Sequence, residues 1–536
     1  MSSSLKNKTS LIHQSAWLVC AKVVGFALSF LLPLLIVRYL TQEEVGLYRQ
    51  VFLVVVTGAS ILPLGFSMSA FYYLSREVEN RASAIFNILI FNFVTGGVAC
   101  IALFNCPQFL GNIFQSDEMT QLAPLIGIVI WLWMFSAFVE TAALANQEAR
   151  LAASFIVGSQ LTKMLFMAGA VVVFATVESF LHAAILQAAI QTVVLLAYLN
   201  SRFPRFWKSG DLVFFRSQLV YALPFGIVGL FYTIQTDIHN YFVGYRFTEA
   251  EFAIYAYGCF QLPLIAVLYE SFSSVLIPRM SELELKGRIR EMLLTALDAT
   301  EKLSLAYFPI FVFLMITAEE FIITLFTSAY SASVPIFRIN LILIPFACLM
   351  LDPIARAFPE MGKFLLKTRI ILFFVLISAL YYGINHFDLL GMISVVVITV
   401  VIERAVSLWK TFRVLGAART DINLLGKIGK TAAASLLSGV FLFLLYTLTK
   451  TYLLNLSQGF ARNLMAPIGV ERASEFIGSS IFLGLWLGIY GTVYTVLVLM
   501  IGAIGRDDKS KLYRLLQNWK RRIIRKPLGL RLEAMD

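Results

Sequence analysis

Residues Ala82–Ser116, ASAIFNILIFNFVTGGVACIALFNCPQFLGNIFQS, contain no Asp, Glu, Lys, Arg or His. A second window, Gln50–Ser75, is equally free of charged residues. Each window is longer than the roughly 20 residues that a helix needs to cross ~30 Å of hydrocarbon. Lipid offers the backbone no hydrogen-bond partner, so segments this long must be helical, whereas a β-barrel would show short alternating segments. The two windows therefore predict transmembrane helices.

The rest of the chain shares this character. Of its 536 residues, 59% are hydrophobic and only 14% are charged, whereas soluble domains carry about 25% charged residues. Apolar runs bounded by charged, Pro or Gly residues predict the spans 14–38, 46–75, 83–105, 119–146, 151–176, 180–200, 219–245, 251–278, 302–328, 333–358, 366–386, 390–414, 430–450 and 475–503. The longest predicted connections are 201–218, 279–300 and 451–474. We predict an all-α polytopic membrane protein of about 14 transmembrane helices, with no room for a soluble catalytic domain.

The Lys and Arg residues predict the orientation of the chain. Cytoplasmic loops carry an excess of these residues, and placing the N-terminus inside collects most of the 43 in cytoplasmic segments. The predicted external loops then hold Arg246, Lys450, Arg462 and Arg472. Both termini are therefore expected in the cytoplasm. Residues 505–536 should form a basic amphipathic tail on anionic lipid headgroups, so the net charge of +11 is not interpreted as nucleic-acid binding.

A repeated motif divides the chain. It reads Thr41-x-x-Glu44-x-Gly46-x-Tyr48 after the first span and Thr248-x-x-Glu251-x-Ala253-x-Tyr255 after the seventh, 207 residues later. After the fourth and tenth spans, Glu140 and Glu148 correspond to Asp352 and Glu360 at a spacing of 212. Two six-span units enter the membrane from the same side, which predicts a pseudo-twofold axis along the membrane normal. The predicted parts are an N-terminal six-helix bundle (1–205), a C-terminal six-helix bundle (206–420), two additional transmembrane helices (421–504) and the tail (505–536).

The stretch from Ser15-Ala-Trp17 to Tyr48 resembles a known family. Its most characteristic part is Arg38-Tyr-Leu-Thr-Gln-Glu-Glu-Val-Gly-Leu-Tyr48. The pattern there is a basic residue, Tyr or Phe, Leu, Thr or Ser, x-x-Glu, a hydrophobic residue, Gly or Ala, and x-Tyr. It is similar to that of the polysaccharide-export branch of the multidrug/oligosaccharidyl-lipid/polysaccharide exporter superfamily, which includes the Wzx-type O-antigen flippases. Two six-helix units with two extra helices fit the length of this chain.

The resemblance implies a flippase that moves a polyprenyl-pyrophosphate-linked oligosaccharide across the bacterial inner membrane by alternating access. The cargo would be a repeat unit of O-antigen, capsule or exopolysaccharide, and a proton or sodium ion is the candidate coupling partner. Flippases for the peptidoglycan lipid precursor and multidrug or cation antiporters share the fold and stay open as alternatives.

An enzymatic role is disfavoured. A membrane glycan polymerase or ligase would need an acid or base on a substantial loop, and no catalytic motif is found outside the spans. The five cysteines are scattered without metal-ligand spacing, so no metal or cofactor is expected.

Two lysines within spans are the first candidates for binding the pyrophosphate group. A charge at the middle of a span costs about 2.5–3.5 kcal/mol, so its presence needs a reason. Lys22 belongs to a heptad stripe with Ser15 and Ser29, and Lys163 lies near the middle of the fifth span. Both are predicted to face a hydrated cleft, where an ammonium group can bind phosphate. Pairing with an intramembrane acid such as Glu140 is the alternative.

Arg49 and Arg338 are further candidates for binding the substrate. They lie near the predicted external ends of the second and tenth spans, where snorkelling to the headgroups explains them equally well. Arg404 is instead expected to form a local pair with the adjacent Glu403.

The seventh span carries a polar cluster of Gln235, Asp237, His239 and Asn240. His and Asp relays occur in pumps, so this cluster is a candidate ion-coupling site. Gln235 and His239 are expected on one helix face and Asp237 on another. Interhelical hydrogen bonding without any role in transport is the alternative.

Three acids are candidates for a gate at the cytoplasmic side. Glu140, Glu270 and Asp352 lie closer to the predicted inner ends of their spans. A purely structural pairing of these acids is the alternative. Prolines are expected to interrupt or kink long helices at Pro33, Pro63, Pro224 and Pro263.

Overall fold

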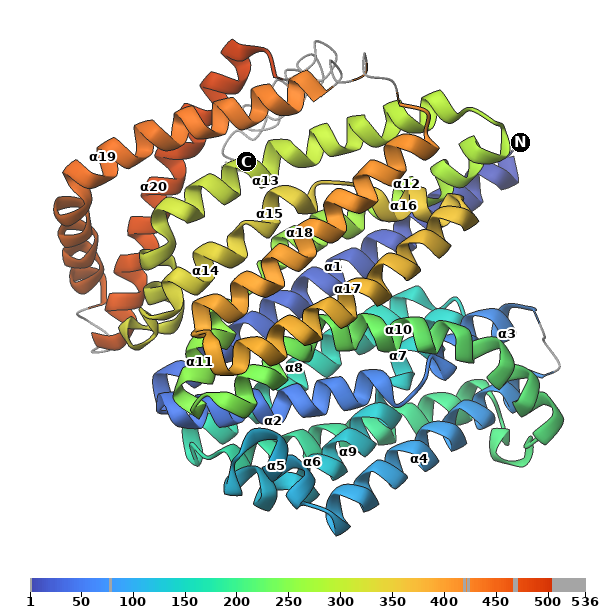
Figure 1. Ribbon diagram of the computed structural model, residues 1–536. Coiled ribbons are helices and arrows are strands. Elements are labelled where there is room, and N and C mark those ends of the chain that lie inside the picture. The colour runs from blue at the N-terminus through green and yellow to red at the C-terminus, as the bar shows by residue number, and fades with distance from the viewer. Residues whose placement is uncertain (1, 77–79, 418–420, 422–424, 466–470, 504–536) are drawn as a thin grey trace, which may run out of the picture. The chain divides into compact units, whose positions relative to one another are not determined.

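The structure is a computed structural model that describes residues 2–76, 80–417, 421, 425–465 and 471–503. Within these residues it contains helices and turns and no strand (Figure 1). Twelve helices are long and apolar enough to cross a membrane, or up to 14 when each of two bent pairs counts as one span. The predicted all-α polytopic membrane fold is therefore confirmed. The predicted tail, residues 505–536, lies outside the described residues.

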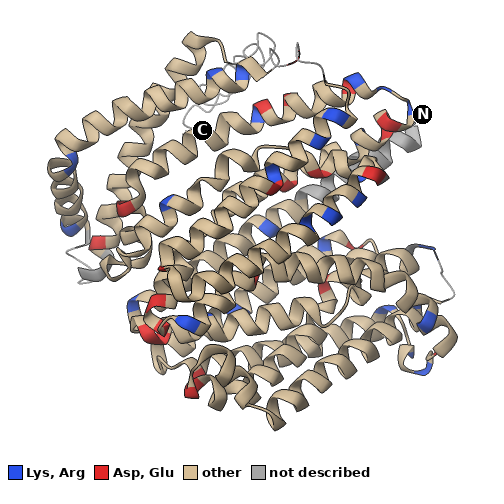
Figure 2. Cartoon of the chain, viewed as in Figure 1, with Lys and Arg blue, Asp and Glu red and all other residues tan. Residues whose placement is uncertain are grey.

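The long helices follow the predicted spans. They are α1 (Ser2–Tyr39), α2 (Gln42–Ile61), α4 (Arg81–Asn105), α6 (Asp117–Ser136) with α7 (Phe138–Ala145), α8 (Ala149–Val173), α9 (Val177–Arg202), α10 (Leu212–Arg246), α13 (Ile289–Phe326), α17 (Pro359–His386), α18 (Leu389–Val414), α19 (Gly426–Met465) and α20 (Glu471–Ile501). Most of their length carries no charge (Figure 2). Short elements between them are η1 (Phe66–Ser69), α3 (Ala70–Arg76), α5 (Gln108–Phe114), η2 (Phe206–Lys208) and η3 (Ser328–Tyr330).

Two predicted spans are bent. The eighth consists of α11 (Glu249–Gly258) and α12 (Pro263–Leu285), which meet at 45°. The tenth consists of α14 (Ser333–Leu341) and α15 (Leu343–Ala347), followed at 48° by α16 (Leu351–Ala357). Pro263 opens α12 directly after the first break, where its missing N–H costs no helical hydrogen bond.

The predicted span 46–75 is also broken. α2 ends at Ile61, and the chain turns at Pro63 before η1 and α3. Leu64 and Gly65 of this turn have φ values of 45° and 71°, a left-handed conformation that suits glycine. Pro33 and Pro224, by contrast, lie inside the continuous helices α1 and α10.

Two predicted connections proved to be mainly helical. α12 and α13 are separated only by residues 286–288, and α19 continues to Met465. The charges that ended the apolar runs are compatible with a helix in water. Glu282, for example, accepts hydrogen bonds from Arg279 at 2.9 Å and Lys286 at 2.5 Å, and such pairs at i,i+3 and i,i+4 support helices.

The chain packs as two compact units. Unit 1 comprises Met1–Val267, Ala318–Leu341 and Lys363–Ala405, and unit 2 comprises Leu268–Thr317, Ile342–Gly362 and Val406–Asp536. In unit 2, α19 and α20 pack along each other. These units reflect packing, whereas the bundles 1–205 and 206–420 reflect a sequence repeat. The division into bundles, the two additional helices (421–504) and the pseudo-twofold axis stay predictions.

The two copies of the repeated motif form the same local structure in unit 1. At the start of α2, the Thr41 hydroxyl accepts from the Glu44 N–H at 3.3 Å, and the Glu44 carboxylate accepts from the Thr41 N–H at 2.8 Å. At the start of α11, Thr248 and Glu251 make the same pair of bonds at 3.3 and 2.9 Å. Each copy is therefore a capping box, which satisfies two free N–H groups of a helix start.

Candidate functional site

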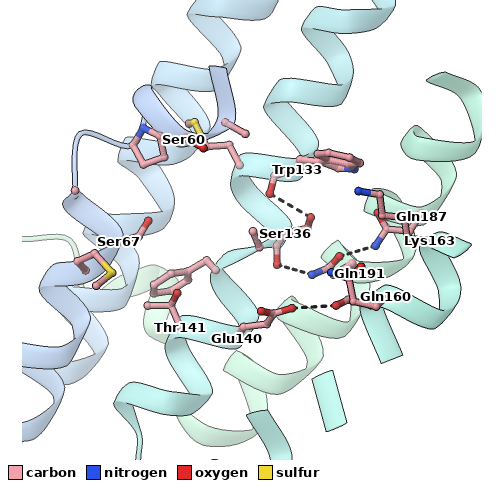
Figure 3. A pocket seen from close by; sticks show the side chains of 18 residues that line it. Ser60, Ser67, Trp133, Ser136, Glu140, Thr141, Gln160, Lys163, Gln187 and Gln191 are labelled. Atoms are coloured by element: carbon pink, nitrogen blue, oxygen red, sulfur yellow. Dashed lines mark hydrogen bonds between the residues drawn. The ribbon is translucent and has the colours of Figure 1, made fainter. Parts of the chain in front are cut away.

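A first polar cavity lies within unit 1, beside Lys163 (Figure 3). Its volume is about 440 Å³, within the ~300–1,000 Å³ range of ligand pockets. It is lined by parts of α2, the turn after α2, α6, α7, α8 and α9. The polar side chains in its lining are Ser60, Ser67, Ser136, Glu140, Thr141, Ser159, Gln160, Lys163, Gln187 and Gln191. We call it the Lys163 cavity.

Lys163 and Glu140 share this cavity without pairing. The Lys163 ammonium lies 4.2 Å from the centre of the Trp133 ring, a cation–π contact. The Glu140 carboxylate instead accepts a hydrogen bond from the Ser159 hydroxyl at 2.9 Å. Among the residues that the structure describes, Lys163 forms no ion pair. The expected alternative, a Lys163–Glu140 pair, is thus not what this structure shows.

Glutamine amides line the same cavity near Lys163. Gln187 donates to Gln191 at 2.6 Å, and Gln191 makes a long contact of 3.5 Å to the Ser136 carbonyl. Figure 3 shows these side chains reaching toward the same space as Lys163. Each amide both donates and accepts hydrogen bonds. The cavity therefore offers one cation, one carboxylate and several neutral polar groups to a ligand.

A second cavity, of about 450 Å³, also lies within unit 1. It brings together four of the predicted site residues, namely Arg49, Asp237, His239 and Asn240. Aromatic side chains make up much of the remaining lining, namely Phe26, Phe30, Tyr48, Phe52, Phe252 and Phe260. We call it the Arg49 cavity. Its residues come from α1, α2, α10, α11 and the break before α12.

Arg49 and His239 are both held by tyrosines of α11. The Arg49 guanidinium carbon lies 4.7 Å from the centre of the Tyr257 ring. Its Nε is buried and has no hydrogen-bond partner among the described residues. His239 is 8% exposed, and its Nδ1 lies 2.8 Å from the Tyr255 hydroxyl. A cation with a free donor therefore faces an aromatic cavity.

Gln235 does not belong to either cavity. Its amide donates to one oxygen of Glu403 on α18 at 3.2 Å, and Arg369 on α17 donates to the other oxygen at 2.8 Å. Asp237, in contrast, lines the same cavity as His239. Sharing a helix face with His239 therefore does not bring Gln235 into the Arg49 cavity, whereas Asp237 lines it.

The prediction that Glu403 pairs with Arg404 is wrong, because Glu403 pairs with Arg369. Adjacent residues on a helix do not face each other, so a partner from another helix was the better expectation. Arg369 was not among the predicted site residues. Its signal was that it is the last charged residue of α17 before a long uncharged stretch, two residues after Lys367.

The remaining candidates lie outside both cavities. Lys22 is exposed on α1, Arg338 on α14 and Glu270 on α12. In unit 2, Asp352 accepts a hydrogen bond from the Tyr269 hydroxyl at 2.8 Å. The roles of these residues in binding and gating stay predictions.

Long apolar helices and two cavities lined by charged side chains define a class: polytopic membrane proteins with internal sites. A family model described as polysaccharide biosynthesis protein matches residues 38–335. The chain belongs to this family, and the predicted resemblance is confirmed. A search of curated proteins gave no match.

Solved structures share the fold at low identity. The lipid II flippase MurJ, in an inward closed conformation, is 14% identical with a TM-score of 0.63, over 94% of this chain and 99% of that one. An inward-facing multidrug resistance MATE family transporter is 16% identical with a TM-score of 0.59, over 74% and 98%. A MOP superfamily transporter from Pyrococcus furiosus is 15% identical with a TM-score of 0.55, over 75% and 96%. The chain thus has the fold of MOP superfamily transporters.

Proposed function

We propose that this protein flips a polyprenyl-pyrophosphate-linked oligosaccharide across the bacterial inner membrane by alternating access. The cargo is a repeat unit of O-antigen, capsule or exopolysaccharide, and both termini lie in the cytoplasm. The observation that carries the proposal is that each cavity contains a cation, Lys163 or Arg49, that is in contact with an aromatic ring. The family match to polysaccharide biosynthesis proteins supports the same cargo class.

The physical argument concerns the pyrophosphate group. Its negative charge must cross ~30 Å of hydrocarbon, where an uncompensated charge is costly. A fixed ammonium or guanidinium in a hydrated cavity offsets that cost, because charge-assisted hydrogen bonds to phosphate are strong. Amides and hydroxyls of the Lys163 cavity suit the sugar hydroxyls that follow the phosphates. The polyprenyl chain stays in lipid.

The other candidates take supporting roles in this proposal. Lys22 lies two turns before Ser29 on α1, about 10 Å along the axis, and Ser29 contacts Gln160 of the Lys163 cavity. Lys22 would therefore meet the headgroup before Lys163 does. Arg338 would bind it on the external side.

Acidic and polar side chains would serve coupling and gating. Asp237, His239 and Asn240, with Gln235 nearby, would bind a proton or sodium ion. The inner gate would involve the three acids Glu140, Glu270 and Asp352.

A flippase for the peptidoglycan lipid precursor is the second candidate. The likeness to the lipid II flippase covers 94% of this chain. That cargo carries the same pyrophosphate group, so the cavities do not distinguish the two candidates. A multidrug cation exporter fits less well, since its cavity would favour acids over Lys163 and Arg49.

The test is the surface glycan of a strain that depends on this gene. We expect Lys163→Gln to lower surface glycan at least tenfold and to raise the lipid-linked precursor inside the cell. The control Lys286→Gln changes an exposed lysine at the end of α12 and should leave both quantities unchanged. Normal glycan with Lys163→Gln would contradict the proposal. Cell lysis with unchanged glycan would favour the peptidoglycan precursor.

A further inference from the structure

Two side-chain contacts form the wall between the Lys163 cavity and the Arg49 cavity. Phe52 lines the Arg49 cavity and Trp133 lines the Lys163 cavity, and their ring centres are 5.8 Å apart at an angle of 46°. Ser29 lines the Arg49 cavity and donates a hydrogen bond to Gln160, which lines the Lys163 cavity, at 3.0 Å. The two cavities are therefore in contact through the side chains of their linings.

The cations lie close to this wall on opposite sides. Lys163 lies on the face of Trp133 itself. Arg49 precedes Phe52 by three residues on α2, about 4.5 Å along the axis. Along α2, residues 48–56 line the Arg49 cavity and residues 59 and 60 line the Lys163 cavity. The cavities thus follow one another along the same helix.

We infer that the two cavities are binding sites in series for the pyrophosphate headgroup, and that the Phe52–Trp133 and Ser29–Gln160 contacts are a partition that opens between them. The inference rests on the proposed function and adds an order: the headgroup binds at Lys163 first and at Arg49 second. Reorientation of a few side chains opens the partition. Such rotamer changes are far faster than helix rearrangements.

Binding at the first site would itself loosen the partition. A phosphate that binds the Lys163 ammonium competes with the Trp133 ring for the same cation. Trp133 then loses the cation–π contact that holds it, and its buried Nε1 has no hydrogen-bond partner among the described residues. Phe52 still contacts Trp133 on that side of the wall. Occupancy of the first cavity is thereby linked to access to the second.

The first experiment separates binding from transfer. The full chain is reconstituted in lipid vesicles with a polyprenyl-pyrophosphate disaccharide, and lipid binding and transfer between leaflets are measured. We expect Lys163→Gln to weaken binding at least tenfold. Arg49→Gln should keep binding within threefold of the native protein while transfer falls at least tenfold. Equal loss of binding in both variants would overturn the serial order.

A second experiment blocks the partition directly. The double variant Ser29→Cys/Gln160→Cys is cross-linked with a short bis-methanethiosulfonate reagent, because a cysteine is shorter than the Gln160 side chain that makes the contact, and is then reduced. The native chain with its own five cysteines receives the same treatment as control. We expect the cross-link to lower transfer at least tenfold, with binding retained and reductant restoring transfer. Unchanged transfer by the cross-linked protein would overturn the partition. If the native protein neither binds nor transfers the lipid, the proposed function fails instead.

Discussion

Gly46 of α2 packs against the backbone of Glu249, the first residue of α11. A Cβ built on Gly46 would lie 1.8 Å from the Glu249 carbonyl oxygen, so only glycine fits this contact. The two copies of the repeated motif therefore touch each other at their first turns. The Glu249 carboxylate also accepts a hydrogen bond from Ser116 at the start of α6, at 2.9 Å. This junction links residues of the two predicted bundles within unit 1.

Gly46→Ala should destabilise the protein. Alanine favours a helix over glycine by about 1 kcal/mol, but overpacking against a backbone carbonyl, which cannot rotate away, costs about 1–3 kcal/mol. We expect a lower unfolding temperature in detergent. Gly158→Ala on α8 is the matched control, because nothing lies within 4 Å of its Cβ position, and it should raise stability slightly. Equal effects of both variants would contradict the close packing.

The two capping boxes predict similar losses of stability when either threonine is replaced. Thr41→Ala and Thr248→Ala each remove the hydroxyl that accepts a helix N–H, a loss of about 0.5–2 kcal/mol. Serine keeps the acceptor, so Thr41→Ser and Thr248→Ser should stay close to the native protein. Thermal unfolding of the four variants checks this. Alanine variants as stable as the serine variants would show that the caps contribute nothing.

The Arg369–Glu403 pair predicts strong coupling between two side chains. Removing one partner of a fully buried ion pair costs about 3–5 kcal/mol, and this pair is only partly buried, with side chains 32% and 14% exposed. Glu403→Gln alone should therefore lower the unfolding temperature by less than that range implies. The double variant Glu403→Gln/Arg369→Met should recover part of the loss, because the positive charge that the carboxylate offset is also removed. If the effects of the two substitutions on the unfolding temperature simply added in the double variant, the two side chains would not be coupled.

The contacts of Arg38 predict that stability depends on how many hydrogen bonds the side chain at this position can donate. Its guanidinium donates to the carbonyls of Thr324 and Leu325, the last turn of α13, at 2.9 and 3.0 Å. Arg38→Met leaves these groups unsatisfied, at about 1–3 kcal/mol each. Arg38→Lys supplies a single ammonium and should fall between methionine and arginine. Unfolding temperatures in that order are expected, and a methionine variant equal to the native protein would contradict the assignment.

The fold was predictable because charged residues are absent from long stretches of the sequence. Most of the uncharged window Ala82–Ser116 is one membrane-length helix, α4, which begins at Arg81 and ends at Asn105. Two breaks were predicted from prolines, since the chain breaks at Pro63 and directly before Pro263. The break at 348–350, between α15 and α16, contains no proline and was not predicted. At the break before Pro263, Asn340 donates to the Phe260 carbonyl at 3.3 Å.

The site was predictable only in part. Lys163 was singled out because it lies near the middle of a predicted span, where a charged side chain has a high free-energy cost. Its contact with Trp133, and the grouping of Arg49 with Asp237, depend on how helices rotate against each other. A single sequence does not contain that rotation. Arg369 was missed because its partner Glu403 has a more obvious neighbour in Arg404.

The Arg38 contact also bears on biosynthesis. Arg38 and Leu325 are 287 residues apart, so the ribosome completes the first helix long before the acceptor carbonyls exist. During that interval the guanidinium still donates to the Leu34 carbonyl of its own helix, and its place in the last turn of α1 lets it reach headgroups or water. When α13 is inserted, its last turn needs no donor from later in the chain. Its carbonyls find a donor that is already in the membrane.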